Sequence, residues 1–375
     1  MKTVADERYV KKPEVLIHIN LMYACFIPLI FIGKLIRWTF MRHTLVDAAI
    51  GHIFIQMALV DGDFSLSEEG PGPVLASLTV FFNNVFGVYT LPQFEIIVTI
   101  IWNIMLFMLL LNLKKHLTIV EAAFVAWSII VLNTFAFTLS KEPVQMLYFI
   151  LIYIVLCNEK ISGTTKWILT VGVLLLSTFT FRRYFGLIAL FMGVAQLAIP
   201  IIARKKINTI VVLVVLLLGC SLIYYLLLEL GPYLPFMNDT QYSELLRVRQ
   251  QPDRVQARTI ISASTRVDTF PWMAINYFLI LLRLMFPFEL LPFGVQFFPY
   301  FLFQLTITGI FLKCLASYRE NTKTVNLAML VYLGFMATSG AYQPDFGSWI
   351  RHSSVLFPVF LVMMKIKTIK NMKEA

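Results

Sequence analysis

The sequence predicts an all-α, polytopic integral membrane protein that forms a single multispan domain over residues 1–375. Its composition is the first reason: 59% of the residues are hydrophobic and only 14% are charged, whereas soluble chains are about 45–50% apolar and about a quarter charged. The second reason is a series of apolar runs close to the length of about 20 residues that crosses a bilayer. These features exclude a soluble enzyme and a disordered chain.

About ten apolar runs are predicted to span the membrane as helices, because lipid offers the backbone no hydrogen-bond partner outside the helix. They cover residues 15–36, 95–113, 118–138, 143–157, 166–181, 184–203, 208–230, 294–313, 325–341 and 353–367. Because basic residues favour the cytoplasmic side, the clusters at 11–12, 114–115, 204–206 and 365–373 place both termini in the cytoplasm. The first run has no small-residue cleavage site, so we expect an anchor rather than a cleaved signal peptide.

Residues 271–291 form one more apolar segment, which does not fit this alternation. If the segment crossed the bilayer, every later basic cluster would lie outside. We therefore expect a re-entrant or interfacial segment, broken at Pro287 and Pro292, which follows an external loop over 231–270. A second external loop, 37–94, begins with residues whose apolar positions recur at helical spacing, which predicts an interfacial amphipathic helix.

The net charge is +10. It becomes informative when lysines and arginines are counted separately on the predicted cytoplasmic and outer sides of the membrane. Fifteen of the 17 lysines fall inside, whereas 11 of the 14 arginines fall outside. The excess of lysine is explained by orientation, so it is no argument for a nucleic-acid partner. Arginine presents a planar fork of donors that holds phosphate or carboxylate at two points. The outer face is thus predicted to bind an anion.

Four arginines are candidates for this contact. Arg182 and Arg183 lie where two predicted spans meet the outer surface, Arg351 opens the last span, and Arg258 lies in the 231–270 loop. The alternative is a solvated loop face with side chains that extend to the interface. That alternative is weaker at span boundaries, where an ionisable group needs a partner or a polar cavity.

Carboxylates are candidates for acid–base chemistry. Asp47 lies near the start of the predicted interfacial helix, where it either acts in chemistry or stabilises the helix N-terminus. Asp61 and Asp63, in a DGDF loop, invite a metal interpretation, but a solvated turn explains them better. We expect no metal and no cofactor, because the sequence has no Walker loop or glycine-rich dinucleotide turn.

Three stretches resemble multispan envelope-polysaccharide proteins, namely O-antigen and capsule polymerases of the Wzy type and the related GT-C glycosyltransferases. LVDAAIGHIFIQMAL looks like the acidic first-loop segment of GT-C enzymes, with Asp47 at the acid position. FTLSKEPVQMLYFILIYIVL followed by LLLSTFTFRRYFGLIALF is similar to the paired spans of the polymerases. MFPFELLP followed by AYQPDFGSWIRHSSVLFPVFL looks like their late surface segment and the acid-x-Gly-x-x-x-Arg-His start of the last span. The first loop has no paired acidic residues, unlike metal-assisted GT-C enzymes.

The resemblance implies glycosyl transfer from a polyprenyl-diphosphate-linked sugar or oligosaccharide at the outer face of the cytoplasmic membrane. Such a reaction needs a general base for the acceptor hydroxyl and positive charge for the departing diphosphate. Asp47 is the first candidate for the base and Asp345 the second, with His352 orienting it or sharing its proton. The implied diphosphate ligands are Arg182, Arg183, Arg258, Arg351 and Lys141. Lys141 alternatively forms a local ion pair with Glu142.

The implied partners are membrane lipid, the lipid-linked substrate and other envelope-polysaccharide assembly proteins. Other functions remain open: addition of a single sugar by a GT-C-type transferase, a flippase or transporter for a lipid-linked glycan, and a membrane scaffold. A flippase is expected to have internal repeats and helices broken near mid-membrane, and the sequence displays neither. A scaffold function does not explain why arginines stand at span boundaries, where burial of their charge costs free energy.

Overall fold

The computed structural model describes residues 16–40, 80–88, 90–138, 140–182, 184–203, 208–230, 261, 270–342 and 345–364. Within these residues the fold is almost entirely helical. Two three-residue strands, β1 (Leu16–His18) and β2 (His116–Thr118), pair antiparallel. Six described helices are long and apolar enough to cross a membrane, or seven if one bent pair counts as a single span. This confirms an all-α membrane protein, whereas ten spans and the orientation stay predictions.

Every range predicted to span contains a helix. The α-helices are α1 (Ile19–Phe40), α4 (Leu91–Leu111), α5 (Ile119–Val131), α6 (Glu142–Cys157), α7 (Gly163–Thr180), α8 (Phe185–Ala203), α9 (Thr209–Leu230), α11 (Phe270–Met285), α12 (Phe298–Ala316), α13 (Lys323–Tyr342), α14 (Phe346–Ser354) and α15 (Phe357–Met363). Shorter elements are the π-helix η2 (Leu132–Ala136) and the 3-10 helices η4 (Phe288–Phe293) and η5 (Val295–Phe297).

Capping side chains and prolines determine where several helices begin. The Thr118 hydroxyl and the Glu121 carboxylate form a capping box at the start of α5, and Ser162 caps α7. Proline occupies the first turn of α4, α6, α12 and α15, where its missing N–H leaves no bond unmade.

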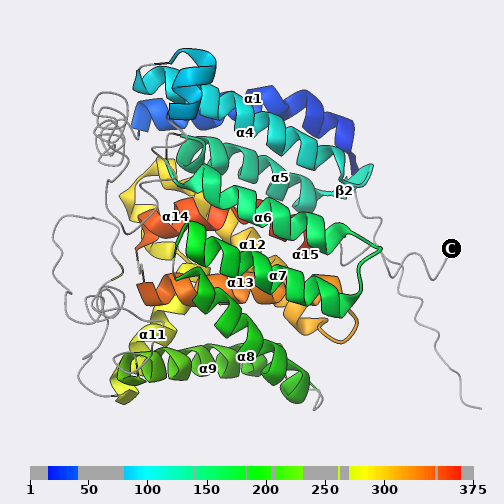
Figure 1. Ribbon diagram of the computed structural model, residues 1–375, viewed down its shortest axis with the longest axis vertical. Coiled ribbons are helices and arrows are strands. Elements are labelled where there is room, and N and C mark those ends of the chain that lie inside the picture. The colour runs from blue at the N-terminus through cyan, green and yellow to red at the C-terminus, as the bar shows by residue number, and fades with distance from the viewer. Residues whose placement is uncertain are drawn as a thin grey trace, which may run out of the picture.

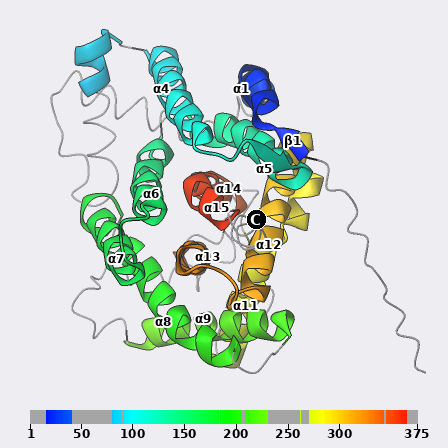
Figure 2. The same cartoon turned by 90° about the vertical axis from the view of Figure 1, so that its right-hand side faces the viewer.

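The helices form a ring around a central pair. Figure 2 shows α4, α1, α5, α12, α11, α9, α8, α7 and α6 surrounding α13 and the α14–α15 segment. The burial agrees, because α13 is almost wholly buried whereas most of α1 faces outward. Close packing holds α13 to α8: a Cβ on Gly334 would lie 2.5 Å from the Ile188 carbonyl oxygen.

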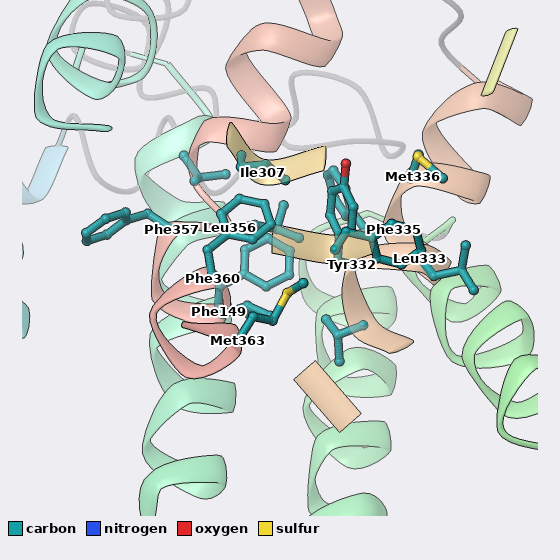
Figure 3. Close-up of a cluster of buried hydrophobic side chains, with 14 of the residues drawn as sticks. Phe149, Ile307, Tyr332, Leu333, Phe335, Met336, Leu356, Phe357, Phe360 and Met363 are labelled. Carbon is teal, nitrogen blue, oxygen red and sulfur yellow. The ribbon is translucent and has the colours of Figure 1, made fainter. Parts of the chain in front are cut away.

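Aromatic and aliphatic side chains fill the space between the centre and the ring. Figure 3 shows Phe149 of α6 and Phe360 of α15 in one buried cluster with Tyr332 and Phe335 of α13. The Phe149 and Phe335 rings lie edge to face, with centroids 5.6 Å apart. The Tyr332 and Phe360 rings also lie edge to face, with centroids 5.3 Å apart, so the core ties the two central helices to each other and α13 to α6.

The predicted last span, 353–367, is different in the structure. It begins earlier, at Phe346, and bends by 64° between α14 and α15. Pro358 explains the break, because it has no N–H to donate to the carbonyl one turn before and its ring clashes with that carbonyl. A bent helix thus occupies the centre of the bundle.

The segment 271–291 folds as α11 and the start of η4. The helix ends at Met285, two residues before Pro287, so the predicted break at Pro287 is confirmed, whereas Pro292, the second predicted break, lies inside η4. It packs between α9 and α13: Tyr277 stacks on Tyr224 at 4.5 Å, and its hydroxyl donates to the Ala337 carbonyl. The re-entrant path through the membrane stays a prediction.

Candidate functional site

Charged side chains from three helix ends meet at one end of the bundle. It is the end where α14 lies and α6 starts (Figure 1). Glu142 is the first residue of α6, Arg182 follows the end of α7, and His352 lies in the last turn of α14. They are 0%, 5% and 2% exposed, respectively. Burial of charge at this level is costly unless the groups satisfy one another.

The His352 ring is the centre of this site. Its Nε2 atom lies 3.1 Å from Nη1 of Arg182 and 3.2 Å from Oε1 of Glu142. Nε of Arg351 lies 3.9 Å from the same carboxylate oxygen. Arg182 also donates to the Tyr184 hydroxyl, and its guanidinium lies 5.3 Å from the centre of that ring. Two arginines and a histidine thus surround one buried carboxylate.

Several buried polar atoms of the site have no hydrogen-bond partner among the residues that the structure describes. They are both carboxylate oxygens of Glu142, Nη2 of Arg182, and both amide atoms of Gln145, which lies one turn along α6 from Glu142. The carboxylate therefore has nearby positive charge without hydrogen bonds. Because buried polar groups are nearly always paired in proteins, these atoms indicate a site completed by another molecule or by a second arrangement of its side chains.

Further charges extend the site toward α1 and α4. Arg37 donates to Glu95 at 2.7 Å, and the Lys34 ammonium donates to the Phe137 carbonyl at 2.6 Å. Arg37 lies within electrostatic range of Arg351. Around the junction, the described cations Lys34, Arg37, Lys141, Arg182 and Arg351 outnumber the carboxylates Glu95 and Glu142. The excess of positive charge favours an anion.

The structure brings four of the predicted site residues together. Arg182, Arg351 and His352 contact one another or Glu142, and Lys141 lies within electrostatic range of Glu142 and His352. Asp47, Arg183 and Arg258 lie outside the described residues.

Asp345 has a structural role at the start of α14. Its Oδ2 atom accepts from the Ser348 backbone N–H at 2.8 Å, which makes it the N-cap of the helix. His352 is seven residues further on, about 10 Å along the helix axis. The carboxylate beside His352 is therefore Glu142 and not the predicted Asp345.

Sequence reasoning missed the importance of Glu142, which it treated as a local partner of Lys141. A signal was present, because Glu142 stands at a span boundary just as the chosen arginines do. Gln145 and Tyr184 were also missed, and nothing in their sequence context separates them from other polar residues near a span end. In the described part of the chain, no group of three or more His, Cys, Asp or Glu residues is placed to hold a metal ion.

Comparison with known proteins found no matching family model, no matching curated protein and no matching solved structure.

Proposed function

We propose that this chain transfers glycan from a polyprenyl-diphosphate-linked sugar or oligosaccharide at the outer face of the cytoplasmic membrane, polymerising or extending envelope polysaccharide. One observation carries the proposal: Arg182 and Arg351 converge on the buried Glu142–His352 pair at one end of the bundle. Under the predicted orientation this is the outer end, where the substrate is presented. Lys141 and Arg37 add positive charge beside the pair.

The chemistry of the site fits this reaction. Guanidinium groups stabilise the negative charge that develops on a departing diphosphate. The neutral imidazole of His352 is suited to take the proton of an acceptor hydroxyl as that oxygen attacks the anomeric carbon, and Glu142 then stabilises the imidazolium. In this assignment Arg182 and Arg351 are diphosphate ligands, as predicted, with Arg183, Arg258 and Lys141 as further candidates. His352 takes the place of Asp47 or Asp345 as the first candidate for the base.

Deleting the gene in its host and measuring glycan length tests the proposal. If the chain is a polymerase, we expect the deletion strain to lose long glycan chains while it still displays single repeat units. A shortened repeat unit would instead support the addition of one sugar. Complementation with the native gene is the positive control, and unaltered glycan in the deletion strain would contradict the proposal.

A flippase for a lipid-linked glycan is the second candidate, and the bent α14–α15 segment favours it. Transporters commonly bind substrate beside discontinuous helices in the middle of the bundle, and this segment bends by 64° inside the ring. The same deletion separates the two functions, because a missing flippase traps lipid-linked units on the cytoplasmic side.

A further inference from the structure

Gln145 is a buried amide whose hydrogen bonds are not made within the described part of the chain. It lies on α6 one turn beyond Glu142, and it is 0% exposed. Neither its Oε1 nor its Nε2 atom has a partner among the residues that the structure describes. Because both ends of the amide are unpartnered, the side chain requires one donor and one acceptor whichever way it is turned. Buried polar groups are nearly always paired in proteins, so this requirement points to a ligand.

A second buried amide, Gln304 of α12, shows how the same bundle satisfies such a side chain elsewhere. Gln304 is also 0% exposed. Its Oε1 atom accepts from the Tyr300 hydroxyl at 3.0 Å, and its Nε2 atom donates to the Tyr332 hydroxyl at 3.1 Å. Hydroxyls suit both ends of an amide, because they donate and accept. The two glutamines therefore differ in their hydrogen bonds and not in their burial.

The side chain of Gln145 faces the interior of the bundle beside the charged site. Glu142, Gln145 and Phe149 recur at helical spacing, which places them on one face of α6, and all three are fully buried. Phe149 identifies this face as the inner one, because its ring packs against Phe335 of α13 (Figure 3). Gln145 therefore lies between the Glu142–His352 pair and the apolar core, about 4.5 Å along the helix axis from Glu142.

The unpartnered atoms of the site include both donors and acceptors. Nη2 of Arg182 and Nε2 of Gln145 donate, whereas Oε1 of Gln145 accepts. The oxygens of an ionised diphosphate only accept hydrogen bonds, so a diphosphate would leave Oε1 of Gln145 unpaired. A sugar supplies the missing donor, because each of its hydroxyls both donates and accepts. The atoms thus match a diphosphate joined to a sugar better than they match a bare anion.

We propose that Gln145 binds the sugar that is attached to the diphosphate, accepting from one sugar hydroxyl and donating to a neighbouring hydroxyl or acetamido oxygen. The inference rests on the proposed function, because Arg182 and Arg351 hold the diphosphate. Nε2 of His352 lies 3.1 Å from Arg182 and 3.2 Å from Glu142, the neighbour of Gln145 on α6. The bond between the sugar and the diphosphate therefore passes close to the proposed base.

Native mass spectrometry of the full-length protein tests the inference with two probes. One is the lipid-linked glycan purified from a strain that lacks this gene, and the other is farnesyl diphosphate, which has the diphosphate but no sugar. Gln145→Met keeps the length of the side chain and removes both polar atoms. We expect the dissociation constant of the glycan probe to rise by about 10-fold in this variant, and that of farnesyl diphosphate to match wild type. Comparing each probe between the two proteins cancels the difference in lipid tail.

Two further variants are controls. Thr170→Val removes another buried hydroxyl that has no partner in the described residues, but Thr170 lies about 15 Å before the end of α7. It should leave both dissociation constants unaltered. Gln304→Met removes the partner of two tyrosine hydroxyls, so it should lower the thermal midpoint of the ligand-free protein. Gln145→Met removes no such bond, so it should leave the midpoint unaltered or raise it.

The outcomes separate the inference from the proposed function. Binding of neither probe to wild type would overturn both. An unaltered dissociation constant of the glycan probe in Gln145→Met, with farnesyl diphosphate bound as in wild type, would overturn the sugar contact and leave the diphosphate site in place. An equal rise for both probes would mean that Gln145 acts on the diphosphate or on the shape of the site, and it would also overturn the inference. Gln145→Leu provides the same comparison if Gln145→Met does not fold.

Discussion

The two ends of the bundle differ in how their buried charged side chains are hydrogen-bonded. At the end away from the site, near β2 (Figure 1), Glu121 uses both carboxylate oxygens: Oε1 accepts from Lys114 at 2.8 Å and Oε2 from the Thr118 N–H at 2.7 Å. Lys166, also buried, donates to the Leu156 carbonyl at 2.7 Å and to the Thr324 hydroxyl at 3.1 Å. At the site end, neither oxygen of Glu142 accepts a hydrogen bond from the described part of the chain.

This difference separates a structural use of charge from a functional one. At the far end, the hydrogen bonds of Glu121 and Lys166 offset the cost of removing these side chains from water. At the site end the cost is only partly offset, and the missing bonds remain available to a ligand. Substitutions at the site end should therefore lower activity, whereas substitutions at the far end should change stability alone.

The largest expected effect is that of Arg182→Gln. The variant loses the guanidinium that contacts His352 and, as proposed, the diphosphate. Removal of one group that stabilises transition-state charge typically lowers the rate by about 10²–10³-fold. Glycan chain length in a complemented deletion strain, and transfer rates in isolated membranes, measure the effect at matched expression. The control is Lys166→Met, at the other end of α7, which should leave the transfer rate unaltered. Full activity of Arg182→Gln would contradict the difference in function between the two ends.

A smaller effect is expected for Arg351→Lys, which keeps the charge but loses the planar fork. Lysine acts as a point charge and gives up bidentate contact with phosphate. We expect the affinity for farnesyl diphosphate to fall by about 10-fold, equivalent to about 1.4 kcal/mol. Calorimetry measures the change, with Lys114→Arg as a control for exchange of the two side chains far from the site. An unaltered dissociation constant would mean that bidentate contact by Arg351 does not contribute to binding.

The sequence was sufficient to predict which segments are helical, because lipid forces backbone hydrogen bonds into helices. It did not predict which helices lie at the centre. The almost fully buried α13 is less apolar than α9, which is less than half buried. In a membrane, polar side chains find partners only inside the bundle, as Tyr332 does with Gln304 of α12. Burial therefore follows polarity, which the lengths of apolar runs do not reveal.

The site was predicted in part. Arg182 and Arg351 were found because ionisable groups at span boundaries need partners, whereas His352 was found through the resemblance at the start of the last span. The identity of those partners depends on contacts between residues such as Arg182 and His352, which lie 170 positions apart. No local spacing encodes such a contact. Glu142 was missed for this reason, since its neighbour in the sequence, Lys141, offered a simpler partner.

The smallest expected effect is that of Glu121→Gln. It tests the difference between the two ends directly, because the same Glu→Gln change should alter the stability of the protein differently at each end. Glu121→Gln retains an acceptor for the Thr118 N–H, as capping boxes with glutamine do, and loses only the charge opposite Lys114. It should lower the free energy of unfolding by about 1 kcal/mol, seen as a thermal midpoint lower by a few degrees in nanodiscs, with unaltered transfer activity. Glu142→Gln, by contrast, leaves the guanidiniums of Arg182 and Arg351 without an opposing charge, so it should lower the midpoint by more than Glu121→Gln does. A smaller loss of stability for Glu142→Gln than for Glu121→Gln would mean that Glu142 does not offset the charge of these arginines, and the argument from charge at the site end would be lost.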